Sequence, residues 1–564
     1  MLISVIALCS TVAAADTSRV DATFEGLQKY FFVKASGVWK SCGQNGGLGK
    51  VSSHFDCKCE GDSPYCKNCY RWWMATTLQS LVALNRAQPG HASLNVTHEL
   101  ITQFRERSPY THSAAPSWAY IDDYLWYVLM WLDVHRWLGV GRDLEDAAGT
   151  FDLMWSWGAD ERCGGITWMY PDVDPRKNAI TTLEAVQAAA QLSVALRKKQ
   201  PLRARRLKER ALNLWGFFQS VGLLSPSGLV QDNVTGVRNA TLLSRHVTKY
   251  TLKHNLAQRM TSLHVRAEVC SRCPSSRLFS PRPTICRLTG PQTAHGKFQC
   301  CNATCSPVCE PRNTLTWTYN QGMFLGAMVD LHALTGELSY LKTGAETLMG
   351  VVAHLTRSNV DGGGVGGGSS DGGGGVGSNA GSNAGSNAGS NAGSNAGSNA
   401  GGNIGSDGAA LTLSNGGGDG AATVLREAVG AFHLDSSKCD ASHDPSSPAG
   451  GDLYSFKAVF MAQLPRFLAA AKQEKSVLTP SQLSAAQKLV ADSADAAWAT
   501  RVLPPFPKAD ICNEFTALPS GGPPKFSWDW AAPPSGGALT CMDSRTQAQA
   551  LSVFVADLVV SGDR

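Results

Sequence analysis

The chain has 564 residues, of which 43% are hydrophobic and 17% are charged, and its formal net charge is +5. This balance describes a globular protein with a large core. A charge of +5 spread over this length is too dilute to indicate a nucleic-acid partner, so neither DNA nor RNA is expected.

The first 15 residues resemble a secretory signal. An apolar run leads to Ala13, Ala14 and Ala15, which form a small-residue cleavage site and would leave Asp16 as the new N-terminus. The run contains no Lys or Arg, so only the α-amino group supplies its positive charge. We expect a signal peptide at residues 1–15 and a secreted, extracellular protein. No other uncharged apolar run approaches the roughly 18 residues of a membrane span, so none is expected in the mature chain.

Cysteine usage also favours an oxidising compartment. Of the 17 cysteines, Cys9 lies in the signal, which leaves an even 16, and many of these cluster at residues 57–69 and 270–309. Each cluster contains a CxxC pair, which could bind zinc in a cytosolic protein, but disulfides are favoured outside the cell. We therefore expect disulfides of undetermined pairing, with no metal and no cofactor. Four sequons typical of a glycoprotein lie at Asn95, Asn233, Asn239 and Asn302.

Helical periodicity dominates the chain, whereas strand-like alternation is almost absent. Several of the predicted helices are apolar on two faces, which indicates helices buried on two sides. Such a set suits either an α-solenoid or a closed double ring, the (α/α)6 barrel, although no repeat of the kind a solenoid normally shows is found among the helices. The predicted helices lie near residues 22–36, 68–88, 95–107, 119–139, 145–158, 177–199, 203–222, 318–336, 338–356, 452–472, 480–500 and 543–560.

Two insertions interrupt this series without ending it. One is Cys-rich and spans residues 250–312. The other, residues 361–420, is Gly-rich and carries six GSNA tetrapeptides from Gly377 to Ala400. Because the second has almost no apolar side chains to bury, it is predicted to be a disordered loop. The prediction is one domain over residues 16–564 with both excursions on its surface.

Two adjacent carboxylates, Asp122 and Asp123, stand at the start of the fourth predicted helix. Taken alone, such a pair is most simply explained by a favourable interaction with the helix dipole. Its neighbours are unusually aromatic, however, with Tyr120, Tyr124 and Trp126 among them. Aromatic faces stack on sugar rings, and paired carboxylates cleave glycosidic bonds. The segment therefore indicates a carbohydrate site.

Five segments, in order, resemble glycoside hydrolase family 76, the endo-α-1,6-mannanases. A weaker sixth, SRTQAQAL, lies at residues 544–551. Together they cover most of the helical portion and neither insertion. The five segments are IDDYLWYVLMWLDVHRWLG (121–139), CGGITWMYPDVDPRKNAITTLEAVQAAAQL (163–192), GLVQDNV (228–234), LTWTYNQGMFLGAMVDLHALTGELSYL (315–341) and GDLYSFKAVFMAQL (451–464).

The resemblance implies an all-α protein with an (α/α)6 barrel. The disulfide-rich insertion and the disordered Gly/Ser/Asn-rich loop, which the barrel is expected to carry, are unusual for the family. It further implies retaining hydrolysis of α-1,6-mannosidic bonds, with Asp122 as the nucleophile and Asp123 as the general acid and then the general base. Tyr127 and Thr167 depart from the family, because a second Trp is common at both positions. Substrate contacts are expected from Trp126, Trp168, Asn178, Asp232, Tyr319, Asn320 and Gln321.

Two other functions remain open at this stage. A transglycosidase of the same family would pass the glycosyl group to a sugar hydroxyl instead of water, and a catalytically silent protein would only bind mannan. The intact Asp122 and Asp123 argue against the silent protein. In each case the expected partner is a mannan polysaccharide, and a monomer is expected. For Asn178 and Gln321, helix capping is the alternative to substrate contact.

Overall fold

The computed structural model describes only part of the chain. By its internal contacts the chain divides into two units, residues 1–357 with 423–564, and residues 358–422. Outside the described residues lie the predicted signal peptide, the Gly-rich loop, residues 250–309 of the Cys-rich insertion and all 17 cysteines. All the described helices belong to the first unit. The described residues are 17–33, 38–39, 72–107, 119–159, 164–170, 176–235, 310–313, 315–358, 422–427, 453–504, 506, 521–527, 530 and 544–562.

Helices dominate the described residues, which confirms the prediction of an all-α protein. Each coincides with one of the predicted helices, with small differences at the ends, because apolar side chains recur along each segment at helical spacing. The helices are α1 (Ser18–Phe31), α2 (Trp72–Ala87), α3 (Leu94–Arg107), α4 (Ile121–Leu138), α5 (Gly141–Gly158), α6 (Ala179–Leu196), α7 (Pro201–Ser220), α9 (Thr318–Thr335), α10 (Leu338–His354), α11 (Leu453–Gln473), α12 (Pro480–Ala499) and α13 (Ser544–Gly562).

Short antiparallel strands join some of these helices. They form the pairs β1–β2, β3–β4 and β8–β9 and the three-stranded sheet β5–β6–β7. Strands of two to four residues are too short to show alternation, so the sequence does not predict them. They are β1 (Phe32–Val33), β2 (Val38–Trp39), β3 (Ala119–Tyr120), β4 (Met169–Tyr170), β5 (Arg176–Asn178), β6 (Asn233–Thr235), β7 (Glu310–Asn313), β8 (Thr356–Ser358) and β9 (Thr423–Leu425).

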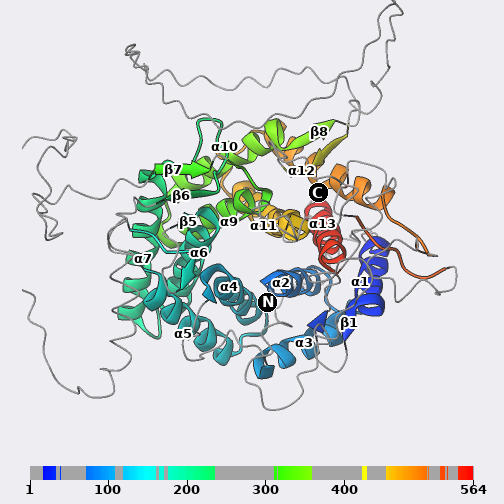
Figure 1. Ribbon diagram of the computed structural model, residues 1–564, viewed down its shortest axis with the longest axis horizontal. Coiled ribbons are helices and arrows are strands. Elements are labelled where there is room, and N and C mark those ends of the chain that lie inside the picture. The colour runs from blue at the N-terminus through cyan, green and yellow to red at the C-terminus, as the bar shows by residue number, and fades with distance from the viewer. Residues whose placement is uncertain are drawn as a thin grey trace, which may run out of the picture. The chain divides into compact units, whose positions relative to one another are not determined.

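Six helices form a closed inner ring in the order α2, α4, α6, α9, α11 and α13 (Figure 1). Each contacts the next, and α13 contacts α2 again. The other six, α1, α3, α5, α7, α10 and α12, lie outside this ring. An open solenoid would not close on itself, so the contacts favour the double ring of the two architectures that periodicity left open.

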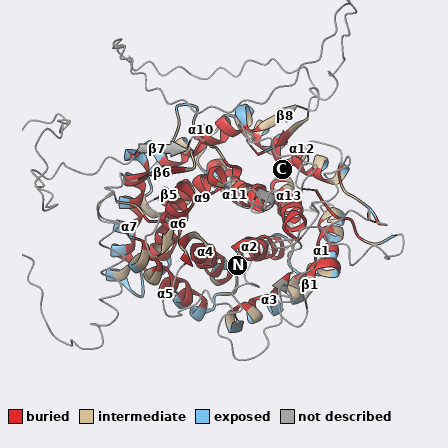
Figure 2. Cartoon of the chain, viewed as in Figure 1, coloured by how far each residue is buried: buried red, intermediate tan, exposed pale blue. Residues whose placement is uncertain are grey.

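Burial follows the same division (Figure 2). The inner helices are buried on nearly all sides, whereas the outer helices carry exposed residues on one face. One helix, α6, is long and apolar enough to cross a membrane, but 89% of it is buried inside the structure. Close packing is helped by Gly322 in α9, where an added Cβ would lie 2.5 Å from the Phe460 Cα of α11. Only glycine allows the two backbones to approach so closely.

Several inner helices begin at the same end of the ring, which we call the N-terminal end. Trp72, the first residue of α2, contacts Phe456 near the start of α11, and Phe456 stacks on Tyr319 near the start of α9. The Ala179 N–H that opens α6 donates to the Asp232 carbonyl, and the Asp232 carboxylate accepts from the Tyr319 hydroxyl. The first turns of α6 and α9 therefore meet at this end.

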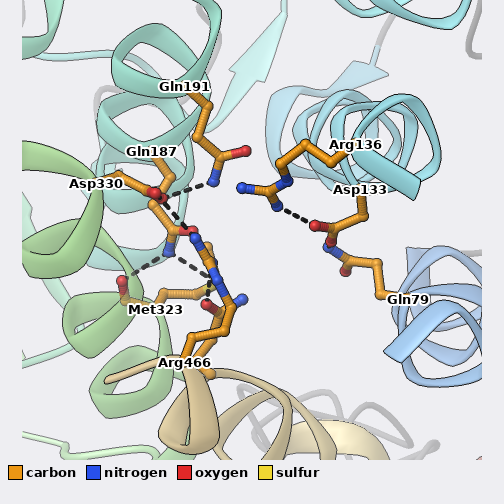
Figure 3. Close-up of polar contacts among 9 residues, drawn as sticks. Gln79, Asp133, Arg136, Gln187, Gln191, Met323, Asp330 and Arg466 are labelled. Atoms are coloured by element: carbon orange, nitrogen blue, oxygen red, sulfur yellow. Dashed lines mark hydrogen bonds and ion pairs between the residues drawn. The ribbon is translucent and has the colours of Figure 1, made fainter. Parts of the chain in front are cut away.

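A charged network fills the C-terminal end of the ring (Figure 3). Asp330 of α9 accepts from Arg466 of α11 at 2.9 Å and from Gln191 of α6 at 2.6 Å. Across the ring, Asp133 of α4 pairs with Arg136. Ion pairs and hydrogen bonds thus join α6, α9 and α11 in a largely buried position, while the Asp133–Arg136 pair lies within α4.

The same network controls the ionisation of Asp133. Burial raises the pKa of this carboxyl, but the charges of Arg136 and Arg466 and a 2.5 Å hydrogen bond from Gln79 outweigh burial and hold the pKa below its usual value. Because the folded chain favours the charged form, this contribution to stability is present above the ordinary carboxyl pKa and is lost as the pH falls.

A buried carboxyl group also accepts hydrogen bonds from the first residue of α9. Glu427, which is 2% exposed, accepts from the Thr318 N–H at 3.0 Å and from the Thr318 hydroxyl. Burial raises the pKa of Glu427 to about 7, while these two hydrogen bonds and the Lys457 charge act in the opposite direction. Lys457 is itself buried, with its ammonium 4.2 Å from the ring centroid of Trp530.

Replacing Arg466 by Met should destabilise the fold by about 3–5 kcal/mol, because the buried Asp330 carboxylate would lose its guanidinium partner. Urea denaturation at neutral pH measures this loss. Arg205→Met is the matched control, because Arg205 pairs with an exposed Glu209, and it should change stability by less than about 0.5 kcal/mol. Equal effects of the two substitutions would show that the network does not stabilise the ring.

Replacing Glu427 by Gln should change how stability depends on pH. With a folded pKa of about 7 against the usual 4.5, the folded wild-type chain holds a proton that the unfolded chain has released between these two values. Wild-type stability should therefore fall relative to Glu427→Gln as the pH rises through this window, by up to about 3 kcal/mol. Urea denaturation near pH 4.5 and near pH 7 measures this change in the free energy of unfolding. The exposed Glu346→Gln should show no such trend, and a pH-independent difference for Glu427→Gln would refute the assignment.

Candidate active site

The Asp122–Asp123 pair occupies the first turn of α4, at the N-terminal end of the ring. Tyr120 precedes the helix in an extended conformation, and its side chain makes no capping hydrogen bond. The Ile121 N–H donates instead to the Trp168 carbonyl at 2.8 Å, while β3 pairs with β4 alongside. The short β3–β4 sheet thus fixes the segment around Trp168 against the start of α4.

Trp168, a predicted substrate contact, donates a hydrogen bond to the first carboxylate of the pair. Its indole Nε1–H donates to Asp122 Oδ2 at 3.0 Å, and the Asp123 N–H donates to Asp122 Oδ1 at 3.1 Å. Both donors stabilise negative charge on Asp122 and fix the direction of its carboxylate. Asp122, Asp123 and Trp168 are all half-buried, which leaves part of each side chain open to solvent.

Two groups of aromatic rings lie beside the pair. Tyr120 and Trp168 are 4.8 Å apart between ring centroids, and both are half-buried. Trp157 stacks on Tyr170 at 5.2 Å and meets the edge of Tyr124 at 5.5 Å. Half-buried rings of this kind can stack on the apolar faces of sugars. Tyr170 was not expected here, because its place beside Trp157 depends on the β3–β4 pairing.

Trp126, a predicted substrate contact, lies in the interior of the ring. It is 3% exposed and stacks on Trp72 of α2 with ring centroids 5.3 Å apart. A side chain so covered offers no face to a sugar. In this structure Trp126 joins α2 to α4, which is the ordinary role of an aromatic residue on a helix buried on two sides.

The structure brings together three of the predicted substrate contacts, Asp232 from the segment before β6 and Tyr319 and Asn320 from the start of α9. Asp232 Oδ1 accepts from the Tyr319 hydroxyl at 3.4 Å and from Asn320 Nδ2 at 3.3 Å, and Oδ2 accepts from Asn233 Nδ2 at 2.9 Å. Asp232 and Tyr319 are half-buried, whereas Asn320 is fully buried. The group offers oxygen acceptors and a hydroxyl at the N-terminal end of the ring.

The side chains of Asn178 and Gln321 make hydrogen bonds within the protein that stabilise the fold. Asn178 caps α6, with its Oδ1 accepting from the N–H and the hydroxyl of Thr181. Gln321 is fully buried and exchanges two hydrogen bonds with the Val230 backbone, at 2.8 and 2.9 Å. The Asn178 contacts are those of the capping alternative. The Gln321 contacts hold the GLVQDNV segment against α9. The Asn233 sequon is also mostly buried, whereas Asn95 is exposed.

Glu184, a third carboxyl whose ionisation the pair affects, was not among the residues predicted from the sequence. Glu184 lies in α6 and is fully buried, and the negative charges of Asp122 and Asp123 act on it. A lone acidic residue inside the apolar run of α6 is the signal that could have drawn attention to it, because an unpaired charge is costly in a core. The described part of the chain contains no group of three or more His, Cys, Asp or Glu arranged to hold a metal ion.

Several solved structures share the fold of this chain. The α-1,6-mannanase GH76A from Salegentibacter sp. HEL1_6 superposes with a TM-score of 0.51 at 14% identity, covering 96% of this chain and 99% of that one. An inactive variant of that enzyme in complex with α-1,6-mannotriose gives 0.52 at 13% identity, with the same coverage. The Lin0763 protein from Listeria innocua gives 0.52 at 12% identity, covering 97% and 98%.

At these identities the likeness to solved structures shows a shared fold. No curated protein matches the sequence. The family model of glycosyl hydrolase family 76 matches residues 21–260, a range that contains the Asp122–Asp123 pair, Trp168 and Asp232. With the resemblance found in the sequence motifs, this match shows that the chain carries a domain of glycosyl hydrolase family 76.

Proposed function

We propose that this chain is a retaining glycoside hydrolase that cleaves α-1,6-mannosidic bonds in mannan, with an endo mode of action. The observation that carries the proposal is the Asp122–Asp123 pair, half-buried at the start of α4, with the Trp168 indole donating to Asp122. Two carboxyl groups side by side suit a double displacement, which needs a nucleophile and a proton donor about 5 Å apart.

Asp122 is the nucleophile. Its carboxylate accepts from Trp168 Nε1–H and from the Asp123 N–H, so it is held in one orientation and its negative charge is stabilised. It attacks the anomeric carbon while Asp123 gives a proton to the departing glycosidic oxygen. Asp123 then removes a proton from water, whose oxygen displaces Asp122 and restores the original anomeric configuration.

Mannan is the proposed substrate, for two reasons. The Salegentibacter enzyme with the same fold is an α-1,6-mannanase, and its inactive variant was solved with α-1,6-mannotriose. This chain also places half-buried rings beside the pair, Trp168 with Tyr120 and Trp157 with Tyr170, where sugar faces could stack. Asp232 and Tyr319 supply polar contacts for sugar hydroxyls; Trp126 is left out because it is buried.

The remaining sequence-based expectations belong to the same proposal. We propose cleavage of the signal at residues 1–15 and secretion of a monomeric protein. Its (α/α)6 barrel domain spans residues 16–564, with the disulfide-rich insertion at 250–312 and the disordered loop at 361–420. The apolar start of the chain and the clustered cysteines support secretion. The signal, residues 250–309 of the insertion, the loop at 361–420 and all the cysteines lie outside the described residues.

Purified wild-type protein should release short oligosaccharides from unbranched α-1,6-mannan with the α configuration retained. Proton NMR at early times reads the anomer, and chromatography reads product length. Asp122→Asn and Asp123→Asn should each lower kcat by at least about 10³-fold without unfolding the protein, because covalent catalysis or proton transfer is lost. Circular dichroism checks the fold of each variant.

Other outcomes of that experiment distinguish the alternatives. An initial β product would overturn the retaining mechanism. Transfer products without net hydrolysis would identify a transglycosidase, and tight binding without turnover would identify a silent mannan-binding protein. Near-normal activity of either Asn variant would refute the assigned roles.

Replacing Trp168 by Phe should lower kcat by about tenfold, because it removes the N–H that donates to Asp122 and keeps most of the ring. Kinetics on α-1,6-mannan measure it, and KM should change less than kcat because stacking is retained. Trp155→Phe is the matched control, since Trp155 lies in α5 with Arg210 over its ring and should leave kcat unchanged. A wild-type kcat for Trp168→Phe would show that the hydrogen bond is not used.

A further inference from the structure

The turn between α6 and α7 and the first half of α7 carry a dense positive charge. The segment RKKQPLRARRLKER, residues 197–210, contains eight cationic residues and a single acid, Glu209. Six of the cations are exposed, and Figure 2 shows exposed residues on the side of α7 turned away from the ring. We call these six residues the basic face. They are Arg197, Lys198, Lys199, Arg205, Arg206 and Lys208.

The two remaining cations of the segment are paired with the protein itself. Arg203 and Arg210 both contact the Asp152 carboxylate of α5, at 2.6 and 2.7 Å. Within the basic face, Arg205 pairs with the exposed Glu209. The other five members have no ion-pair partner among the residues that the structure describes. A solvated surface usually mixes charges of both signs, so this face has an excess of unpaired positive charge.

Helix electrostatics accounts for only part of the basic face. The three cations of the turn, residues 197–199, follow the last residue of α6, where the helix dipole favours positive charge. The other three, Arg205, Arg206 and Lys208, lie in the first half of α7, whose first turn contains no acidic residue. The start of a helix does not favour cations, and like charges on one helix face repel each other. The dipole therefore does not explain the second group.

The basic face lies away from the catalytic pair. Helix α6 begins at the N-terminal end of the ring, where the Ala179 N–H donates to the Asp232 carbonyl. It runs for 18 residues, about 27 Å, to the turn at residues 197–199. Helix α7 then packs along the outside of α6 (Figure 1). A long anionic chain could therefore lie on the basic face without covering the Asp122–Asp123 pair.

The side chains of α7 favour one kind of anionic partner. A membrane-binding helix inserts several apolar side chains, but Leu202, which is 74% exposed, is the one large apolar residue exposed on this helix. Single-stranded nucleic acid stacks on exposed rings, whereas the aromatic residues of α7 are buried. A polysaccharide with sulfate, phosphate or carboxylate groups needs only guanidinium and ammonium partners, which this face supplies.

We propose that the basic face is a docking surface for an anionic polysaccharide. The polysaccharide lies across the turn after α6 and the first half of α7, with its acidic groups paired to the exposed Arg and Lys side chains. Docking of this kind holds the protein beside other glycans and so raises the local concentration of substrate at the catalytic pair. This benefit rests on the proposed function, whereas the binding itself does not depend on it.

Binding to heparin, a linear sulfated polysaccharide, tests the proposal, with neutral dextran as the uncharged comparison. Surface plasmon resonance should show binding to heparin that weakens between about 50 and about 200 mM NaCl, because charged contacts release counterions. Dextran should not bind. The triple variant Arg205→Gln/Arg206→Gln/Lys208→Gln should bind heparin at least about tenfold more weakly, with a shallower salt dependence. Its exposed substitutions should leave the fold intact, which circular dichroism checks.

A second triple variant removes the same charge from exposed positions elsewhere and is the matched control. Lys29→Gln/Arg86→Gln/Lys475→Gln should keep the affinity for heparin within about twofold of wild type, because these cations lie outside the basic face. Equal weakening by both triple variants would refute a defined surface and indicate a response to net charge alone. No binding of the wild type to heparin at the lower salt concentration would also refute the proposal.

Two further ligands separate the polysaccharide from other polyanions. Tighter binding to vesicles of phosphatidylserine and phosphatidylcholine, or to a duplex DNA, than to heparin would overturn the assignment. Asp122→Asn should bind heparin as wild type does, so the docking surface is tested even if mannan proves not to be the substrate. Conversely, the basic-face triple variant should keep the wild-type kcat on soluble α-1,6-mannan, so a failure of docking is distinguishable from a failure of the proposed hydrolysis.

Discussion

Closure of the inner helical ring is the constraint on which the rest of the structure depends. Each inner helix is covered by two ring neighbours and by outer helices, so its side chains are buried on almost every face. A polar group buried in such a ring lowers the stability of the fold unless it finds a partner. The C-terminal end meets this demand with ion pairs among Asp133, Arg136, Asp330 and Arg466. This end holds helices together, which leaves the N-terminal end available for chemistry.

At the N-terminal end, the fold concentrates acidic groups. The helix start that favours the Asp122–Asp123 pair also brings it close to Glu184 of the next inner helix. Burial and the two like charges together raise the pKa of the Glu184 carboxyl well above its usual value. A glycosidase needs this asymmetry, because one carboxyl must attack while another supplies a proton. The electrostatics of the ring therefore support acid–base chemistry and impose a cost on stability.

Aromatic residues divide between the interior of the ring and its N-terminal end. Trp126 and Trp72 are buried and join α2 to α4, whereas Trp168, Tyr120, Trp157 and Tyr170 remain half-buried near the pair. The difference follows from position: Trp126 lies inside a helix, while Trp168 and Tyr170 lie in the β4 segment that β3 holds against the start of α4. A short strand pair thus presents rings that a helix would bury.

The sequence by itself determined the helices, their order and the family, because helical periodicity and the DD, GGI-W and TYNQG motifs are local patterns that survive without knowledge of packing. It also proposed Asp122, Asp123, Trp168 and Asp232 as site residues, of which the structure places Trp168 in contact with Asp122. Only the tertiary structure showed that Trp126 and Gln321 are buried, that Asn178 caps α6, and that the charges of the pair act on a buried Glu184. The physical reason is that burial and electrostatic environment depend on residues distant in sequence: Glu184 lies 62 positions from Asp122, and closure of the ring brings them together.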